Sequence, residues 1–395
     1  MQKGVSIVNK MDLTSPDGLY KFFTEDIGIL LLQKMKEESD DNLIATHHDM
    51  MENCEIKDGR QDVQFLIELN TTEKKIIAME YNNKSVPLID DDIFRYNARG
   101  IITAAISNII LVNHFFNLHK LNAEAFAISL HKALSENHPI FRIMYPHTIN
   151  LFEQNDAARK FLFNWKSTKG TLHHFLPIDS KSHDYITQQC IKEFNIYKLI
   201  EFTEFNTDLA NDAKLFYNVI KEYITNMINH YYKNKDDLLN DIELFDWFTN
   251  VKLYIPNTLF LTYTKKSLID LISIFIFSSS ILHEIAGAAL LDFYHNPFTV
   301  SPSLYSNGFS HYDTQSYAFE VALANVALYG TAIHAVSLRT DYSDLIGTDS
   351  ESIKIVKTAW SKFEEVHKII IEKNKTRKYK QDILSMNTLE YSIAT

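Results

Sequence analysis

A nearly continuous apolar stretch runs between Thr264 and His295. Apolar residues dominate every turn from Leu268 to Leu291, and no proline or glycine comes before Gly287. Such a pattern predicts one long helix, hydrophobic all round, in the centre of a large core. The serines at 278–280 and the imidazole of His283 interrupt the run before it reaches the roughly twenty residues of a membrane span. We therefore expect a buried central helix and no transmembrane segment.

A second helical pattern extends from Phe94 to Leu134 and contains His114 and His119. Five residues make about 1.4 turns, so the two imidazoles lie roughly 140° apart on a regular helix. They converge only if the helix is locally widened by a π-turn, which often marks a functional site. Together with His283 they could form a facial set of three histidines for non-haem iron, because imidazole suits iron, zinc and copper. Taken alone, His283 could equally be a core histidine bonded to backbone carbonyls.

The clearest strand signal is a β-hairpin near the N-terminus. Residues 63–69 and 75–81 alternate apolar and polar side chains around a short polar turn. The helical core is expected to begin near Asp92, while residues 1–62 are polar apart from a helix candidate at Tyr20–Met35. The predicted fold is therefore mainly α around the long central helix, divided into a polar N-terminal segment (1–62) of unknown role and a helical domain (63–395).

Composition supports a large helical core and narrows the range of partners. The 395 residues are 46% hydrophobic, with only 10 Gly and 8 Pro. The net charge of -11 argues against a nucleic-acid surface, and the basic run Lys373–Lys380 reads as a solvated helix end. Cys54 and Cys190 form no disulfide framework. Residues 1–20 lack the apolar core of a signal peptide, so we expect a cytoplasmic protein or one exported without a standard signal.

Several motifs resemble the lipoxygenase family. They are His138–Arg142 with Pro146-His147, which is similar to the signature after the family's first iron-binding helix; Asp156–Arg159, similar to its short Ala-Arg segment; Ala213–Val251; the central stretch itself, similar to the second iron-binding helix; and Gly330–Asn374. The resemblance runs from about Val63 to the end. The N-terminal β-sandwich common in that family has no counterpart, and the catalytic region looks shortened.

The resemblance implies a helical catalytic domain around a non-haem iron, with a fatty acid or other lipid as partner. The reaction would be dioxygenation of a polyunsaturated fatty acid after hydrogen abstraction from a bis-allylic carbon. The family holds iron with three histidines, a weak Asn or His ligand and a C-terminal isoleucine carboxylate. Carried over to this chain, the ligand set is His114, His119, His283 and the carboxylate of Thr395. A lipid partner also leaves peripheral membrane contact open.

The chain departs from the family downstream of His283, which falls on the third histidine. Gly287 stands where a ligand Asn or His is expected, and Leu290 stands where the family places a glutamine that orients ligands and substrate. The chain ends two residues after Ile393, so either the carboxylate is displaced or Thr395 supplies it. Ala158 matches the position where Ala or Gly steers the face of oxygen attack. Ala158, Gly287 and Leu290 are therefore expected to border the substrate.

The upstream histidines raise a question of register. An ungapped alignment from Glu124 puts Phe115 and Lys120 at the ligand positions, whereas one inserted residue restores His114 and His119. Two hypotheses follow: a lipoxygenase-like iron dioxygenase, or a catalytically degenerate lipoxygenase-fold protein without iron that serves as a lipid-binding or protein-interaction module.

Overall fold

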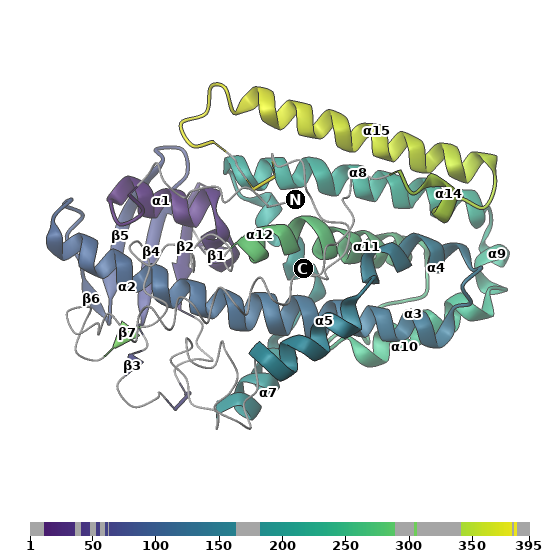
Figure 1. The fold of residues 1–395 in the computed structure, drawn as a ribbon, viewed down its shortest axis with the longest axis horizontal. Helices are drawn as coiled ribbons and strands as arrows, with labels where there is room; N and C mark the ends of the chain where they lie inside the picture. The colour runs from purple at the N-terminus through teal and green to yellow at the C-terminus, as the bar shows by residue number, and fades with distance from the viewer. Residues whose placement is uncertain are drawn as a thin grey trace.

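The structure, a computed structural model, describes residues 12–35, 41–47, 53–55, 60–61, 63–162, 182–288, 304–305, 341–380 and 383–384. Long helices run side by side along the molecule, and a small sheet lies at one end (Figure 1). This is the mainly α architecture with a small N-terminal sheet that the hydrophobic pattern predicts.

The first long helix carries two of the histidines. It consists of α2 (Asp92–Asn108), the π-helix η3 (Ile109–Glu124) and α3 (Ala125–Ala133), which follow one another without a break. The Asp91 side chain accepts a hydrogen bond from the backbone N–H of Phe94 and so caps the helix at the predicted start.

The second long helix carries His283. It comprises α11 (Lys265–Phe277), the π-helix η8 (Ser278–Leu282) and α12 (His283–Ala288). Both long helices have the length and apolar composition of a membrane span, but 89% of each apolar window is buried within the protein. Burial in the core accounts for their composition. The predicted central helix is confirmed over the described residues, with a π-helical segment in its middle.

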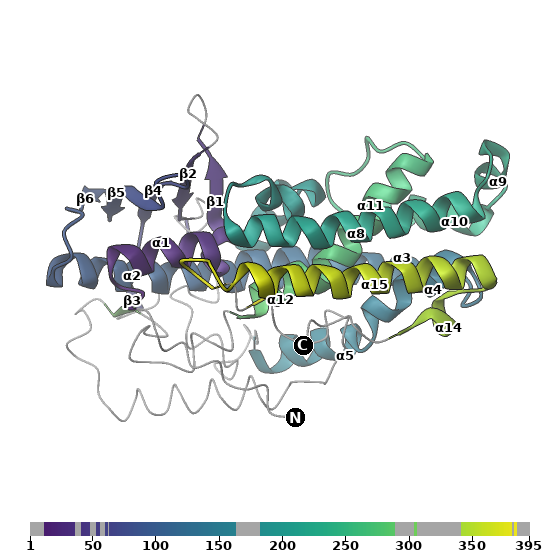
Figure 2. The same cartoon turned by 90° about the horizontal axis from the view of Figure 1, so that it is seen from above.

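The remaining helices surround this pair. They are α1 (Pro16–Glu25), η1 (Ile27–Leu31), α4 (Pro139–Met144), η4 (Tyr145–Thr148), α5 (Leu151–Ala157), η5 (Ala158–Leu162), α7 (His183–Glu193), η7 (Ile196–Glu204), α8 (Asp208–Tyr231), α9 (Lys235–Leu239), α10 (Ile242–Tyr254), α14 (Ser343–Ile346) and α15 (Ser350–Lys373). Helix α8 packs against both α11 and α15, and α10 packs against α3. The second view shows α15 following the length of the molecule (Figure 2).

The main sheet is antiparallel, with the order β1-β2-β4-β5-β6. Its strands are β1 (Leu32–Lys34), β2 (Asn42–Thr46), β4 (Phe65–Asn70), β5 (Lys75–Tyr81) and β6 (Lys84–Ser85). The predicted hairpin is confirmed as β4 and β5. A further pair joins β3 (Arg60–Gln61) to β7 (Leu304–Tyr305).

The predicted helix at Tyr20–Met35 is wrong in extent. Helix α1 ends at Glu25, a 3₁₀ turn follows, and the chain then enters β1. The side chain of Asp26 accepts a hydrogen bond from the backbone N–H of Ile27 and caps the 3₁₀ turn. Strand β2 pairs with β4 from Asn42 opposite Asn70 onward, so strands on both sides of residue 62 build one sheet.

Candidate metal centre

Three buried imidazoles meet where η3 and α12 of the two long helices contact each other. The Nε2 atoms of His114 and His283 are 3.0 Å apart, and the Nε2 atom of His119 lies 3.1 Å from each of them. The exposed fraction is 5% for His114, 8% for His119 and 2% for His283. The histidines that the sequence analysis grouped therefore form a nearly equilateral triangle of ring nitrogens in the core.

The π-helix η3 explains why residues five apart share a side. Its hydrogen bonds join residues i and i+5, so His114 and His119 are stacked along one face instead of being about 140° apart. The second π-helix, η8, ends immediately before His283, whose backbone N–H donates to the carbonyl of Ser278. The side chain of Asn122 donates to the Ser278 hydroxyl oxygen across 2.7 Å, which ties the two widened segments together.

The donor set fits a single metal ion. The Nδ1 atom of His119 lies 2.8 Å from the Asn155 amide oxygen, so Nδ1 carries the proton and Nε2 presents its lone pair. In a neutral imidazole the Nε2 atom is either a hydrogen-bond donor or an acceptor. With three such atoms, at least one edge of the triangle must join two donors or two acceptors. A cation facing three lone pairs removes this conflict.

The edge length also discriminates between coordination geometries. With metal–nitrogen distances of roughly 2.1 Å, nitrogens at right angles around one ion are about 3.0 Å apart, whereas a tetrahedral set is about 3.4 Å apart. The observed edges of 3.0 and 3.1 Å match the right-angled arrangement. Facial sets of this kind, with further positions free, suit non-haem iron.

Burial keeps the upstream imidazoles in the form that binds metals. It lowers the pKa of His114 well below its usual value, and the adjacent His119 adds to this effect. Burial also lowers the pKa of His119 to about 4, although the hydrogen bond to Asn155 and the charge of Glu124 act in the opposite direction. Both rings are therefore neutral near pH 7.

A chain of polar contacts supports His119 from behind. Asn155 on α5 accepts from His119 through its oxygen and donates through its amide nitrogen to Glu124 Oε2 at 3.2 Å. Arg159 Nη1 in turn donates to both Glu124 oxygens at 3.0 and 3.1 Å. The role of Asn155 was not predicted from the sequence, although this residue lies directly before the Asp156–Arg159 motif.

The ungapped alignment is wrong in placing Phe115 and Lys120 at the ligand positions. The Lys120 ammonium lies over the rings of Phe115 and Phe116, 5.3 and 5.2 Å from their centroids. Burial lowers the pKa of Lys120, and the nearby Arg159 lowers it further. The π-helix therefore turns the histidines, and not their following neighbours, toward α12.

The other sequence-predicted positions are distributed as follows. Ala158 begins η5 and packs, partly buried, against the hydrophobic core. Gly287 follows His283 by one turn, and a Cβ at this glycine would have His283 Cε1, 4.0 Å away, as its nearest described neighbour. Leu290 and Thr395 lie outside the described residues.

Two histidines outside the triangle make contacts of their own. His138 caps α4 by accepting from the backbone N–H of Ile140, and its Nε2 atom is 3.0 Å from Asp241 Oδ2. His131 contacts the rings of Phe141 and Tyr145.

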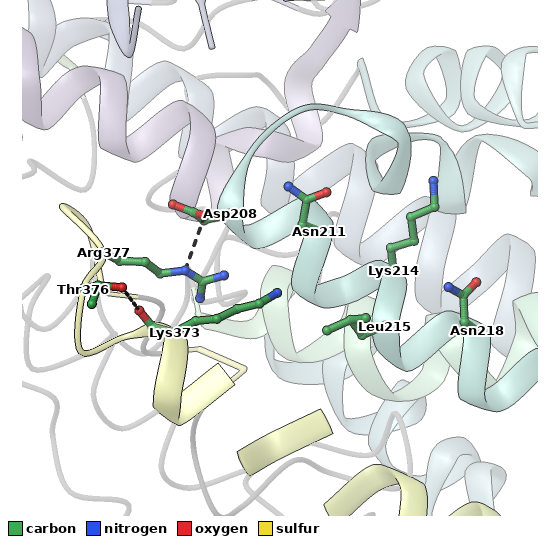
Figure 3. A pocket seen from close by; sticks show the side chains of 8 residues that line it. All are labelled: Asp208, Asn211, Lys214, Leu215, Asn218, Lys373, Thr376 and Arg377. Carbon is green, nitrogen blue, oxygen red and sulfur yellow. Dashed lines mark hydrogen bonds and ion pairs between the residues drawn. The ribbon is translucent and has the colours of Figure 1, made fainter. Parts of the chain in front are cut away.

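A polar cleft of about 510 Å³ lies between α8 and the C-terminal end of α15 (Figure 3). It is lined by Asp208, Asn211, Lys214, Leu215, Asn218, Lys373, Thr376 and Arg377. Arg377 points from its segment toward Asp208, and their contact is 3.3 Å. The lining includes none of the three histidines, and its polar character differs from the apolar channel expected for a lipid.

Comparisons with known proteins find sequence similarity to lipoxygenases. A family model described as Lipoxygenase matches residues 98–176, which include His114, His119 and Asn155. Lipoxygenase 2, chloroplastic, from Arabidopsis thaliana is 27% identical over 164 residues, covering 36% of this chain and 18% of the relative. The allene oxide synthase-lipoxygenase protein of Plexaura homomalla is 27% identical over 167 residues, covering 39% and 15%. The matched segments thus make up less than a fifth of these relatives.

The fold is shared over much more of the chain. A crystal structure of a LOX variant, Delta413-417:GS, superposes with a TM-score of 0.83 at 15% identity, covering 99% of this chain and 69% of the other. Coral 8R-lipoxygenase superposes with a TM-score of 0.80 at 16% identity, covering 97% and 67%. This chain is therefore similar in sequence to lipoxygenases around the first histidine helix, and over nearly its whole length it has the fold of their helical catalytic domain.

Proposed function

We propose that the protein is a non-haem iron dioxygenase that acts on polyunsaturated fatty acids or related lipids. The observation that carries this proposal is the buried triangle of Nε2 atoms with edges of 3.0 and 3.1 Å. A core histidine cluster without a cation would leave like groups facing each other in a site from which water is excluded. Relatedness to lipoxygenases supplies the reaction class.

The chain's own residues would hold and orient the ion. His114, His119 and His283 would ligate iron through Nε2, and Asn155 would keep the His119 ring turned toward it. The Thr395 carboxylate is proposed as a further ligand on the strength of the family resemblance. Bound iron would supply the abstraction of a hydrogen atom from a bis-allylic carbon that precedes the addition of dioxygen. The surrounding apolar core excludes water from the reacting centre.

The proposed substrate is a fatty acid with a pair of methylene-interrupted double bonds. One structural neighbour, a LOX variant, was solved in complex with arachidonate and superposes with a TM-score of 0.79 at 15% identity. Ala158, Gly287 and Leu290 are proposed to border this substrate. Since Gly287 has no side-chain donor, it leaves room beside His283 instead of adding a ligand.

Iron content and product formation test the proposal together. Protein loaded with ferrous iron is separated from free metal, and its iron is measured before incubation with linoleic or arachidonic acid. We expect bound iron, oxygen uptake and an increase in conjugated-diene absorbance. All three should be lost in His283→Ala and kept in His131→Ala, which changes an exposed histidine on α3.

The alternative hypothesis, a lipid-binding or protein-interaction module without iron, predicts the opposite results. In that case the protein binds no iron and forms no diene, yet still binds the fatty acid, and His283→Ala leaves lipid binding unchanged. This combination of results would refute the dioxygenase proposal.

A further inference from the structure

The corner between α10 and α11 exposes an unusual amount of apolar surface. Leu259 and Phe260, in the connecting loop, are 76% and 70% exposed, and Leu253 at the end of α10 is 70% exposed. Tyr254 beside it is 36% exposed. We call these four residues the α10–α11 corner. Single exposed apolar residues are ordinary on protein surfaces, but a contiguous group marks an interaction site.

The corner is held rigidly in place. The Thr258 hydroxyl donates to the carbonyl of Ile255 at 2.7 Å, and the backbone N–H of Leu261 donates to the carbonyl of Thr258 at 3.0 Å. Lys252 Nζ donates to the carbonyl of Leu261 at 2.7 Å, which closes the loop. Ile255, Thr258 and Leu261 are buried. Leu259 and Phe260 are thus presented outward by a loop that is anchored in the core at every third residue.

The loop is also attached to the end of α7. The Asn257 side chain, at a residue with a φ of 59°, donates to the carbonyls of Phe194 and Lys192 at 2.7 and 3.1 Å. These bonds bring Lys192, which is exposed, and Ile191, which is 44% exposed, next to the corner. The apolar surface therefore continues from the loop onto a second helix.

The charge around the corner is positive on a chain that is otherwise acidic. Residues 247–269 contain three lysines and no acidic residue, whereas the whole chain has a net charge of -11. Lys132 reaches the corner from α3, where its Nζ donates to the Tyr254 hydroxyl oxygen at 2.8 Å. Lys192 is a further exposed cation, and the exposed Glu193 beside it offsets its charge. A second copy of this surface would bring lysine against lysine, so the charge favours an anionic partner over self-association.

The corner has the features of peripheral membrane proteins: a projecting leucine and phenylalanine, a tyrosine beside them and lysines around them. Apolar side chains enter the headgroup region, tyrosine prefers the interface, and lysine is attracted to anionic lipid within about a Debye length. We propose that the α10–α11 corner docks on a phospholipid bilayer that contains anionic lipid, with Leu259 and Phe260 inserted among the headgroups. This surface is separate from the histidine triangle, so its test stands whether or not the histidines bind iron.

Vesicle sedimentation tests the docking. The full chain is mixed with vesicles of phosphatidylcholine alone or with phosphatidylserine added, and the bound fraction is measured against lipid concentration. We expect tighter binding to the phosphatidylserine vesicles and weaker binding in high salt. Leu259→Ser combined with Phe260→Ser should weaken binding by at least about tenfold, because both side chains lose favourable transfer from water. Lys192→Gln should weaken it roughly fivefold.

A matched pair elsewhere on the surface serves as the control. Ile89 and Ile93 are 64% and 65% exposed but flank Asp90, Asp91 and Asp92, so they face an anionic membrane with like charge. Ile89→Ser combined with Ile93→Ser should leave vesicle binding unchanged. Circular dichroism and thermal unfolding establish that both double variants fold.

Three results would overturn the proposal. The first is no binding to either vesicle, and the second is equal loss of binding in the two double variants. The third is a dimer in light scattering that disappears when Leu259 and Phe260 are replaced, which would assign the corner to self-association.

Discussion

The hydrogen bond between His119 and Asn155 gives the sharpest test of how the chain prepares its metal centre. We consider Asn155→Leu, which keeps the side-chain volume and removes the acceptor. His119 and Asn155 are 8% and 2% exposed, and their contact is 2.8 Å, so water cannot readily replace the lost partner. The His119 ring would no longer be fixed in the tautomer that turns its Nε2 lone pair toward His114 and His283.

The expected loss follows from the energetics of such supporting contacts. Removing a group that orients a metal-bound histidine typically lowers metal affinity by about 10- to 100-fold. At about 1.4 kcal/mol per tenfold change, this corresponds to roughly 1.4 to 2.8 kcal/mol. The range agrees with the cost of about 1–3 kcal/mol for leaving one buried polar group without a partner.

Competition with a chelator of known affinity measures the effect. Ferrous iron is titrated anaerobically, and zinc is used in parallel because it has no redox chemistry. Gln154→Leu provides the control, since Gln154 is a buried amide on the same helix and makes no hydrogen bond to the three histidines within the described residues. If Asn155→Leu binds both metals as tightly as the unmodified protein, or if Gln154→Leu weakens binding equally, the orienting role of Asn155 is refuted.

Three further predictions concern stability. Burial and the neighbouring Asp208 carboxylate raise the pKa of Glu25 from 4.5 to about 8, so the folded protein keeps a proton that the unfolded chain has released. The free energy of unfolding should therefore fall as the pH rises from about 4.5 to 8. Glu25→Gln should flatten that slope in urea titrations at several pH values. Arg377→Leu should cost about 3 kcal/mol in urea unfolding, because Arg377 Nη1 and Nη2 contact the fully buried Asp212 carboxylate at 2.6 and 2.8 Å and only Lys373, at 3.5 Å, then remains to balance its charge; a cost below about 1 kcal/mol would contradict this. Gly287→Ala should raise the melting temperature of the metal-free protein, since helical Gly costs about 0.5–1 kcal/mol relative to Ala and the nearest described atom to the new Cβ is 4.0 Å away; a lowered melting temperature would show that the space is filled.

Local pattern was sufficient to predict several parts of the fold. The apolar run around Leu268–Phe277 has no breaker, so its burial and helical form followed directly, and the start at Asp92 matched a capped helix. The hairpin of β4 and β5 followed from strict alternation. Strands β1 and β2 are only 3 and 5 residues long, and their pairing with residues 65–70 is a tertiary effect that no local window contains.

The candidate site divides in the same way. The spacing of His114 and His119 indicated that a π-helix was needed for them to converge, and η3 is such a helix. Their alignment with the family's ligand positions was ambiguous, because an alignment compares sequence positions and not the direction in which each side chain leaves the helix. A π-helix changes that direction. The role of Asn155 depends on α5 packing against η3, a contact between residues 36 positions apart, and so had no signal in the sequence.

Iron stoichiometry after loading and gel filtration shows whether His114, His119 and His283 act as one ligand set. We expect one iron per chain in the unmodified protein and loss of that iron in each of the three single alanine variants, with their far-UV circular dichroism unchanged. Iron retained at full stoichiometry after removal of any one of these imidazoles, or no iron bound by the unmodified protein, would contradict it.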